Sequence, residues 1–180
     1  LGWNNDPNGM VYYDGEWHLY FQHNPYGWKW GNMHWGHATS TDLVHWKQLP
    51  IAIYNKQHGD WAFSGSAVVD ENNTAGWQTG NEKVIVASWT STGRGECVAY
   101  SNDRGRTFTE YEGNPVVQHA GRDPKIIWYQ PDKHWVMAVY DESEESGRSI
   151  AFYTSGDMKN WEFQSKLEGY YECPEIFELP

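Results

Sequence analysis

The sequence lacks the features that mark several common classes of protein. None of its apolar runs approaches the ~20 residues that a membrane-spanning helix needs, so we expect no membrane partner. Basic residues are few, 13 against 24 acidic ones, and the net charge of −11 argues against binding a phosphate backbone. The sequence therefore predicts neither a membrane protein nor a nucleic-acid-binding protein.

Cysteine is also scarce. The two cysteines, Cys97 and Cys173, have a spacing that fits neither a metal site nor a redox motif. Whether they pair stays open at this point, and we expect Cys173 to fill a small apolar space. His34 and His37 are three residues apart, which would place them on opposite faces of a strand, and no third ligand is evident. We therefore assign no metal and no cofactor.

Aromatic residues and short apolar runs are abundant. The chain has 12 Trp and 12 Tyr, and aromatics make up 17% of its residues, which suits a tightly packed β protein or a sugar-facing surface. Apolar runs such as 17–21 and 83–89 alternate with clusters of Gly, Asn, Asp and Pro, without a long 3.6-residue period. Asp14-Gly15 and Asp132-Lys133 fall where hairpin turns are expected. The predicted fold class is all-β.

One pattern recurs along the chain: an acid, a proline one or two places later, and then an apolar-rich run. It occurs at residues 3–9 (Trp-Asn-Asn-Asp-Pro-Asn-Gly), 122–124 (Arg-Asp-Pro) and 172–174 (Glu-Cys-Pro). Residues 63–66 (Phe-Ser-Gly-Ser) carry serine in the corresponding place. We predict a tight polar turn at the first motif, with positive φ at its Asn-Gly pair, and a strand after each motif. A fold that brings these strand starts together would form one acidic pocket.

A second pattern alternates with the first. Residues 40–46, 101–108 and 155–161 each read as Ser-x-Asp followed by a turn and an aromatic residue. We interpret the acid of each turn as structural, because such side chains bond nearby backbone N–H groups. Together the two patterns define units of about 50–60 residues with four strands each, which is typical of β-propeller blades. The innermost strands of a propeller surround a central axis, so their starts converge.

The first pattern resembles the motifs of a known family. Residues 3–9 resemble the Trp-Met-Asn-Asp-Pro-Asn-Gly signature of glycoside hydrolase family 32, whose members split fructans and sucrose; Asn4 stands in place of Met, and we expect it to point away from Asp6. Residues 122–124 and 172–174 resemble the second and third motifs in the same order. The resemblance implies a five-bladed β-propeller, of which this chain covers about the first three blades and the start of the fourth. The expected blades are 1–62, 63–122, 123–171 and the start at 172–180.

We also expect the chain to be part of a longer protein, because a partial propeller exposes open strand edges. The resemblance implies that Asp6 is the nucleophile, Glu172 the acid/base and Asp123 a third acid that grips fructose hydroxyls and tunes the pKa of Glu172. Such a retaining mechanism places the two reacting carboxyl groups about 5–5.5 Å apart. The other residues expected to contact substrate are Asn5, Gln22, Trp30, Phe63, Ser64 and Arg122, whereas Trp35 is interpreted as structural.

The predicted function is release of fructose from levan, inulin or sucrose through a covalent fructosyl-enzyme intermediate. A fructosyltransferase would pass the same intermediate to a sugar. An inverting propeller glycosidase acting on arabinose or xylose polymers would need a carboxyl gap of ~6.5–9.5 Å. A non-catalytic sugar-binding propeller would lack one of the two carboxylates. The expected partner is a fructose-containing oligo- or polysaccharide, and a secreted, extracellular location follows from polymeric fructans staying outside cells. Substrate preference, exo or endo attack and oligomeric state stay open.

Overall fold

Three four-stranded antiparallel sheets make up the structure, a computed structural model that describes residues 2–143 and 147–179. The strands are β1 (Trp3–Tyr13), β2 (Glu16–Asn24), β3 (His34–Ser40), β4 (Lys47–Ile53), β5 (Ala62–Asp70), β6 (Val84–Ser91), β7 (Gly95–Ser101), β8 (Thr109–Glu110), β9 (Gly121–Tyr129), β10 (His134–Asp141), β11 (Ser149–Ser155) and β12 (Glu162–Glu168). No helix in the described ranges is long and apolar enough to cross a membrane. The all-β prediction is confirmed.

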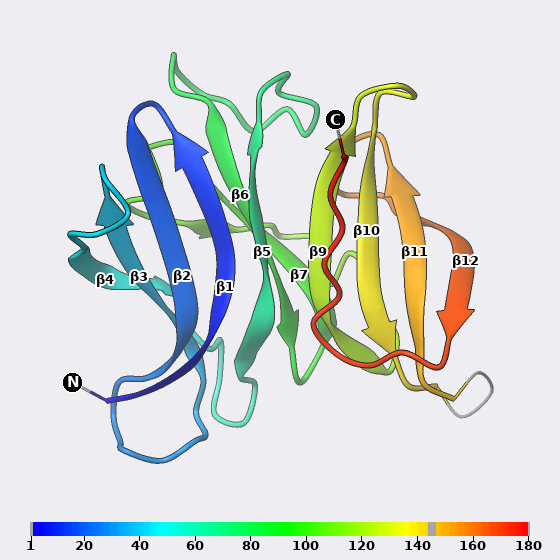
Figure 1. Ribbon diagram of the computed structural model, residues 1–180, viewed down its shortest axis with the longest axis horizontal. Coiled ribbons are helices and arrows are strands. Elements are labelled where there is room, and N and C mark those ends of the chain that lie inside the picture. Colours follow the sequence, from blue (N-terminus) through cyan, green and yellow to red (C-terminus); the bar gives the residue numbers. More distant parts are fainter. Residues whose placement is uncertain (1, 144–146, 180) are drawn as a thin grey trace.

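Each sheet contains four strands that are consecutive in the chain, in the orders β1-β2-β3-β4, β5-β6-β7-β8 and β9-β10-β11-β12. Figure 1 shows the first strands of the sheets, β1, β5 and β9, side by side, with β4 and β12 on the outer sides. This arrangement is that of consecutive propeller blades, as predicted. The residue limits proposed for the blades remain a prediction.

The middle sheet is buried on both faces, and β6 shows how the sequence achieves this. Every residue of β6 is buried, and successive side chains of a strand point to opposite faces. Ile85 and Trp89 belong to the core shared with the first sheet. Val84 and Val86 belong to the core shared with the third sheet. A strand in this position therefore carries apolar residues on both faces, as residues 84–87 do.

The predicted Ser-x-Asp turns are present, each between the third and fourth strand of a sheet. In the second sheet, Ser101 Oγ donates to Asp103 Oδ1 at 2.6 Å. The same oxygen accepts the backbone N–H groups of Arg106 and Thr107 at 3.0 and 2.9 Å. Asp42 and Asp157 accept backbone N–H groups in the same way, which confirms the structural interpretation. The sequence did not reveal that the residue after each acid adopts positive φ; these residues are Leu43, Arg104 and Met158.

The predicted hairpin turns are also present. Asp14 and Gly15, with φ of 45° and 85°, join β1 to β2 as a two-residue loop. Positive φ at both positions is the geometry that matches the twist of the flanking strands. Lys133, with φ of 54°, ends the turn between β9 and β10.

Each innermost strand carries a β-bulge near its start, where two residues face one residue of the second strand. Asn5 and Asp6 occupy the space opposite Gln22 in β1, because Asn4 pairs with His23 and Pro7 with Phe21. The corresponding bulges are Phe63-Ser64 opposite Thr90 in β5, and Asp123-Pro124 opposite Val139 in β9. Bulges interrupt the ladder and re-aim side chains, so they turn these residues out of the regular sheet.

The turn predicted at residues 3–9 is wrong. These residues lie within β1, whose register also shifts between Asn8 and Met10. Gly9 does not adopt positive φ; instead, a Cβ atom on Gly9 would lie 2.0 Å from the backbone nitrogen of Ala67. The glycine therefore permits close approach of β1 to β5, a tertiary requirement that resembles a turn signal in the sequence.

The strand predicted after Glu172 is also absent. Residues 174–179 form no strand, and Figure 1 shows this segment, in red, running along β9. Phe177 and Leu179 are 69% and 81% exposed, whereas Ile176 packs against the core cluster of Ala138, Tyr140 and Ile150. A strand needs a partner for its ladder hydrogen bonds, and none of the described residues pairs with this segment.

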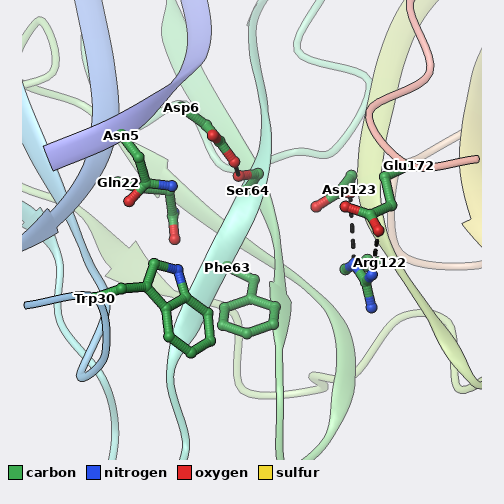
Figure 2. A pocket seen from close by; sticks show the side chains of 9 residues that line it. All are labelled: Asn5, Asp6, Gln22, Trp30, Phe63, Ser64, Arg122, Asp123 and Glu172. Carbon is green, nitrogen blue, oxygen red and sulfur yellow. Dashed lines mark hydrogen bonds and ion pairs between the residues drawn. The ribbon is translucent and has the colours of Figure 1, made fainter.

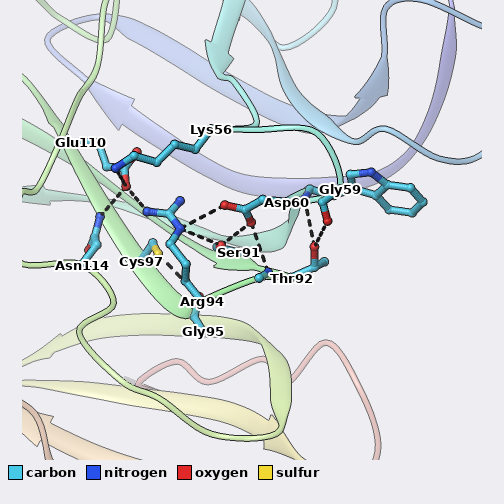
Figure 3. Close-up of polar contacts among 12 residues, drawn as sticks. Lys56, Gly59, Asp60, Ser91, Thr92, Arg94, Gly95, Cys97, Glu110 and Asn114 are labelled. Atoms are coloured by element: carbon cyan, nitrogen blue, oxygen red, sulfur yellow. Dashed lines mark hydrogen bonds and ion pairs between the residues drawn. The ribbon is translucent and has the colours of Figure 1, made fainter.

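A polar network anchors the beginning of β5 and was not predicted. Figure 3 shows Arg94 placed between two carboxylates, those of Asp60 and Glu110. Arg94 Nε lies 3.1 Å from Asp60 Oδ2, and Ser91 Oγ also donates to Asp60. Asp60 is buried and precedes β5 by two residues. The network therefore fixes the segment that leads into the bulge of β5.

We expect Asp103→Ala to lower the free energy of unfolding by about 1–2 kcal/mol, because it leaves the N–H groups of the turn without their acceptor. Chemical denaturation of the intact protein measures this loss. The control is Asp132→Ala, which removes an exposed carboxylate from a hairpin turn and should change stability by less than about 0.5 kcal/mol. Equal losses in the two variants would contradict the structural role of Asp103.

Candidate active site

One cavity of about 260 Å³ lies where the bulged starts of the innermost strands meet. It is lined by Asn5, Asp6, Gln22, Trp30, Phe63, Ser64, Arg122, Asp123 and Glu172. The structure therefore brings all nine predicted site residues together. Figure 2 shows Asp6 beside Ser64 on one side of the cavity, and Asp123, Arg122 and Glu172 grouped on the other.

The Asp6 side of the cavity is open and polar. Asp6 is exposed, and its Oδ2 atom accepts a hydrogen bond of 3.0 Å from Ser64 Oγ. The neighbouring Asn5 accepts a hydrogen bond of 2.8 Å from Trp3 Nε1, which orients its amide. Asn4 is exposed and does not line the cavity. The bulge of β1 therefore presents one carboxylate oxygen held by a hydroxyl and a second one available to a ligand.

Side chains of the first sheet support the bulge of β5. Gln22 Nε2 donates to the carbonyl of Ala62 at 3.0 Å, and Trp35 Nε1 donates to the carbonyl of Phe63 at 2.8 Å. Both side chains are almost completely buried. Trp35 is therefore structural, as predicted. Gln22 uses one N–H of its amide on the backbone, which leaves its carbonyl oxygen and its second N–H for a ligand.

An aromatic wall closes one side of the cavity. The ring of Trp30 lies 6.1 Å from that of Phe63, and both contact Trp61, at 5.2 and 6.1 Å between centroids. Trp30 remains 56% exposed, so its face is accessible. The sequence did not single out Trp61, because a tryptophan two residues before a predicted site residue carries no signal of its own. Such a wall suits the apolar C–H face of a sugar ring.

Arg122 connects the acids on the other side of the cavity. Its Nη2 atom lies 2.6 Å from Glu172 Oε1, and its Nη1 atom lies 3.7 Å from Glu142 Oε1. Its Nε atom lies 3.9 Å from Asp123 Oδ2, and the guanidinium lies over the ring of Tyr140. One cation thus neutralises part of the charge of three carboxylates. The sequence did not single out Glu142, which lies in no motif.

Asp123 is the buried acid of the site, with 7% of its surface exposed. Burial raises the pKa of Asp123 to about 6, although the backbone N–H of Cys173, at 3.1 Å from Oδ2, acts in the opposite direction. Asp6 and Glu172 are both exposed. The site therefore combines two carboxylates accessible to a ligand with one that is fixed by its surroundings.

Cys173 differs from its prediction. It is exposed instead of filling an apolar space, and its Sγ atom lies 3.5 Å from Asp123 Oδ2. The position follows from the bend at residues 172–173, which brings the backbone N–H of Cys173 to the buried carboxylate. Both Cys97 and Cys173 are free, so the pairing left open by the sequence is absent from this structure.

The two histidines considered as metal ligands are both buried in contact with protein atoms. His34 Nδ1 lies 2.7 Å from the carbonyl of Asn32, and His37 Nε2 lies 3.1 Å from His18 Nδ1. In the part of the chain that the structure describes, no group of three or more His, Cys, Asp or Glu side chains has the arrangement of a metal site.

Comparison with known proteins places the chain in a family. Residues 1–180 match the family described as "Glycosyl hydrolases family 32 N-terminal domain". The levanase of Bacillus subtilis (strain 168) is 51% identical over 192 residues, covering 99% of this chain and 28% of the levanase. Invertase 1 of Saccharomyces cerevisiae is 44% identical over 197 residues, covering 99% of this chain and 36% of the invertase.

Solved structures give the same result. The β-fructofuranosidase of Schwanniomyces occidentalis, complexed with fructosyl-erythritol, has a TM-score of 0.88 and 39% identity over 99% of this chain and 38% of that one. The exo-inulinase of Aspergillus awamori has a TM-score of 0.85 and 35% identity over 96% of this chain and 39% of that one. The chain thus spans 28% to 39% of the length of these relatives. The match over all 180 residues shows that the chain belongs to family 32 of the glycosyl hydrolases.

Proposed function

We propose that the protein is a retaining glycoside hydrolase that releases fructose from β-fructosides. The observation that carries this proposal is the cavity in which two exposed carboxylates, Asp6 and Glu172, come from segments far apart in the chain. Cleavage of a glycosidic bond needs two carboxyl groups, one to attack and one to transfer protons. The relatives named levanase, invertase and exo-inulinase support a fructoside as the substrate.

In the first step, a carboxylate oxygen of Asp6 attacks the anomeric carbon of fructose. The bond from this carbon to the leaving-group oxygen breaks through an oxocarbenium-like transition state, and Glu172 donates its proton to that oxygen. The products are the free leaving group and an ester between fructose and Asp6. The hydrogen bond from Ser64 Oγ to one oxygen of Asp6 favours attack through the other.

In the second step, water attacks the anomeric carbon while Glu172, now a carboxylate, takes a proton from the water. The ester bond breaks, fructose leaves with retained configuration, and Asp6 is again ionised. The ion pair between Arg122 and Glu172 suits this second step, because it stabilises the carboxylate that must act as a base. The first step requires Glu172 to carry a proton, so Arg122 must then rely on Asp123 and Glu142 for its charge partners.

The remaining side chains bind and orient the sugar. In this proposal, Gln22, Asn5 and Asp123 bond fructose hydroxyls, and Trp30 and Phe63 provide the apolar wall. The support is that all five residues line the cavity. The proposal also includes a substrate that is levan, inulin or sucrose, and an extracellular location. The latter is supported by a relative named "Extracellular exo-inulinase".

We expect Asp6→Asn to reduce fructose release by at least about a thousandfold, because the amide cannot form the covalent intermediate. The measurement is product analysis of the intact protein incubated with levan, inulin or sucrose. The matched control is Asp132→Asn, which makes the same change at an exposed turn and should retain full activity. Lengthened oligosaccharides in place of free fructose would identify a transferase. Absence of any product from the wild type would overturn the proposal.

We expect kcat/KM to rise as the pH increases through about 6, because the ionised form of Asp123 is the stronger acceptor for fructose hydroxyls. The effect of pH on folding stability has the opposite sign: the contribution of Asp123 to stability falls as the pH rises. A carboxyl whose pKa is raised from 3.8 to about 6 on folding contributes most to stability below pH 3.8 and loses this contribution as the pH rises through 6.

The test is the pH profile of kcat/KM for the wild type and Asp123→Asn. The variant should lose the rise near pH 6 and have a KM about 10- to 100-fold higher, the range expected for one hydrogen bond to a charged group. A variant profile that keeps this rise would assign the titration to another group.

A further inference from the structure

A buried chain of hydrogen bonds joins Asp123 to the middle sheet. The backbone N–H of Asp123 donates to Thr90 Oγ1 at 2.9 Å. Thr90 Oγ1 donates to Glu96 Oε2 at 2.8 Å, and Glu96 Oε1 lies 2.9 Å from His119 Nε2. Thr90 and Glu96 are 4% and 0% exposed. None of the functional roles described above uses Thr90, Glu96 or His119.

Asp123 needs this contact because of its backbone. Asp123 and Pro124 share the space opposite Val139 in the bulge of β9, so the N–H of Asp123 has no acceptor in the ladder with β10. Asp123 also has φ of 67°, a conformation that few residues other than glycine adopt. Such a conformation persists only where neighbouring groups hold it in place. The hydroxyl of Thr90 is the group that accepts this N–H.

The chemistry of the hydroxyl explains why threonine is suited to this position. A hydroxyl has two lone pairs and one proton. Thr90 accepts the N–H of Asp123 with one lone pair, and its proton is directed at Glu96. Valine has nearly the same shape but could do neither. A valine here would leave a buried N–H and a buried carboxylate oxygen without their partners.

Glu96 is itself held firmly. Burial raises the pKa of Glu96, and His119 acts against this shift by contacting the second carboxylate oxygen. The other ring nitrogen of His119 lies 3.7 Å from Asp141 Oδ1, and Asp141 is paired with Lys166. Glu96 can therefore not rotate freely, and the direction in which it receives the proton of Thr90 is fixed.

We propose that Thr90 and Glu96 are positioning residues that hold Asp123 in its strained conformation and aim its carboxyl into the cavity. This inference rests on the proposed function, since it assigns an effect on catalysis to residues that do not contact the substrate. The carboxyl of Asp123 is otherwise approached by Arg122, Glu172 and Cys173. Those contacts act on the side chain, whereas Thr90 acts on the backbone.

Ser88 offers a matched control on the face of β6 that packs against the third sheet. Ser88 lies two residues before Thr90 on β6 and therefore points to the same face. Its hydroxyl is buried but has no hydrogen-bond partner. Ser88→Ala thus removes a buried hydroxyl from the same strand and the same face without touching Asp123. Thr90→Ser keeps the hydroxyl at the site, and Thr90→Val removes it.

The experiment compares these three variants with the wild type as intact proteins. We expect Thr90→Val to lower kcat/KM for a fructoside by about 10- to 100-fold, the size of effect that small misplacement of a substrate-contacting group produces. Its rise in kcat/KM near pH 6 should move to lower pH, because a released Asp123 carboxyl becomes more exposed. Thr90→Ser and Ser88→Ala should both keep the wild-type kcat/KM and the wild-type pH of its rise.

A second readout does not depend on activity. Deuterium exchange of a peptide that covers Asp123 should be faster in Thr90→Val, by about tenfold or more at one amide, and unchanged in Ser88→Ala. If the wild type releases fructose but Thr90→Val keeps both its pH profile and its exchange rate, the inference is overturned and the proposed function stands. If the wild type releases no fructose, the exchange result alone decides whether Thr90 holds Asp123.

Discussion

Loss of regular strand pairing at the starts of β1, β5 and β9 is the constraint on which the site depends. Each bulge frees side chains to point into the cavity but leaves backbone groups without ladder partners, and buried backbone groups must be satisfied. For the bulges of β5 and β9, the partners come from the preceding sheet. Gln22 and Trp35 serve the bulge of β5. Thr90 and Ser66 serve that of β9. Each blade therefore completes the geometry of the next.

Electrostatics imposes the second constraint. The chain has a net charge of −11, and three acids surround Arg122. Because Glu172 is exposed, water and substrate can compete for its contact with Arg122. Asp123 is buried, and its conformation is set by hydrogen bonds to backbone and side chain. The three acids around Arg122 therefore have different environments, because Glu142 and Glu172 are exposed to solvent and Asp123 is buried.

The fold class, the Ser-x-Asp turns and the grouping of nine residues around one cavity could be predicted from sequence, because each depends on a pattern that recurs or on motifs in order. The chemical roles of those nine residues remain predictions. The prediction of a turn at residues 3–9 was wrong because Gly9 is required by the close approach of Ala67 in another sheet and not by a turn. The contacts of Glu96 and Glu142 could not be predicted from the sequence. A single acid in a strand or loop carries no local signal, and its partners are distant in the chain.

The same contacts that join the sheets also orient the site, and this has a consequence for how substitutions act. A change at Asp103 weakens a turn whose hydrogen bonds are all local, so it affects stability without moving the cavity. A change at Gln22, Trp35 or Thr90 removes a bond between sheets that also supports a bulge. Stability and site geometry are therefore coupled for interior polar residues near the axis and independent at the outer turns. The precision of the cavity is consequently a property of how the sheets are joined, since the bulges of β5 and β9 both find partners in the preceding sheet.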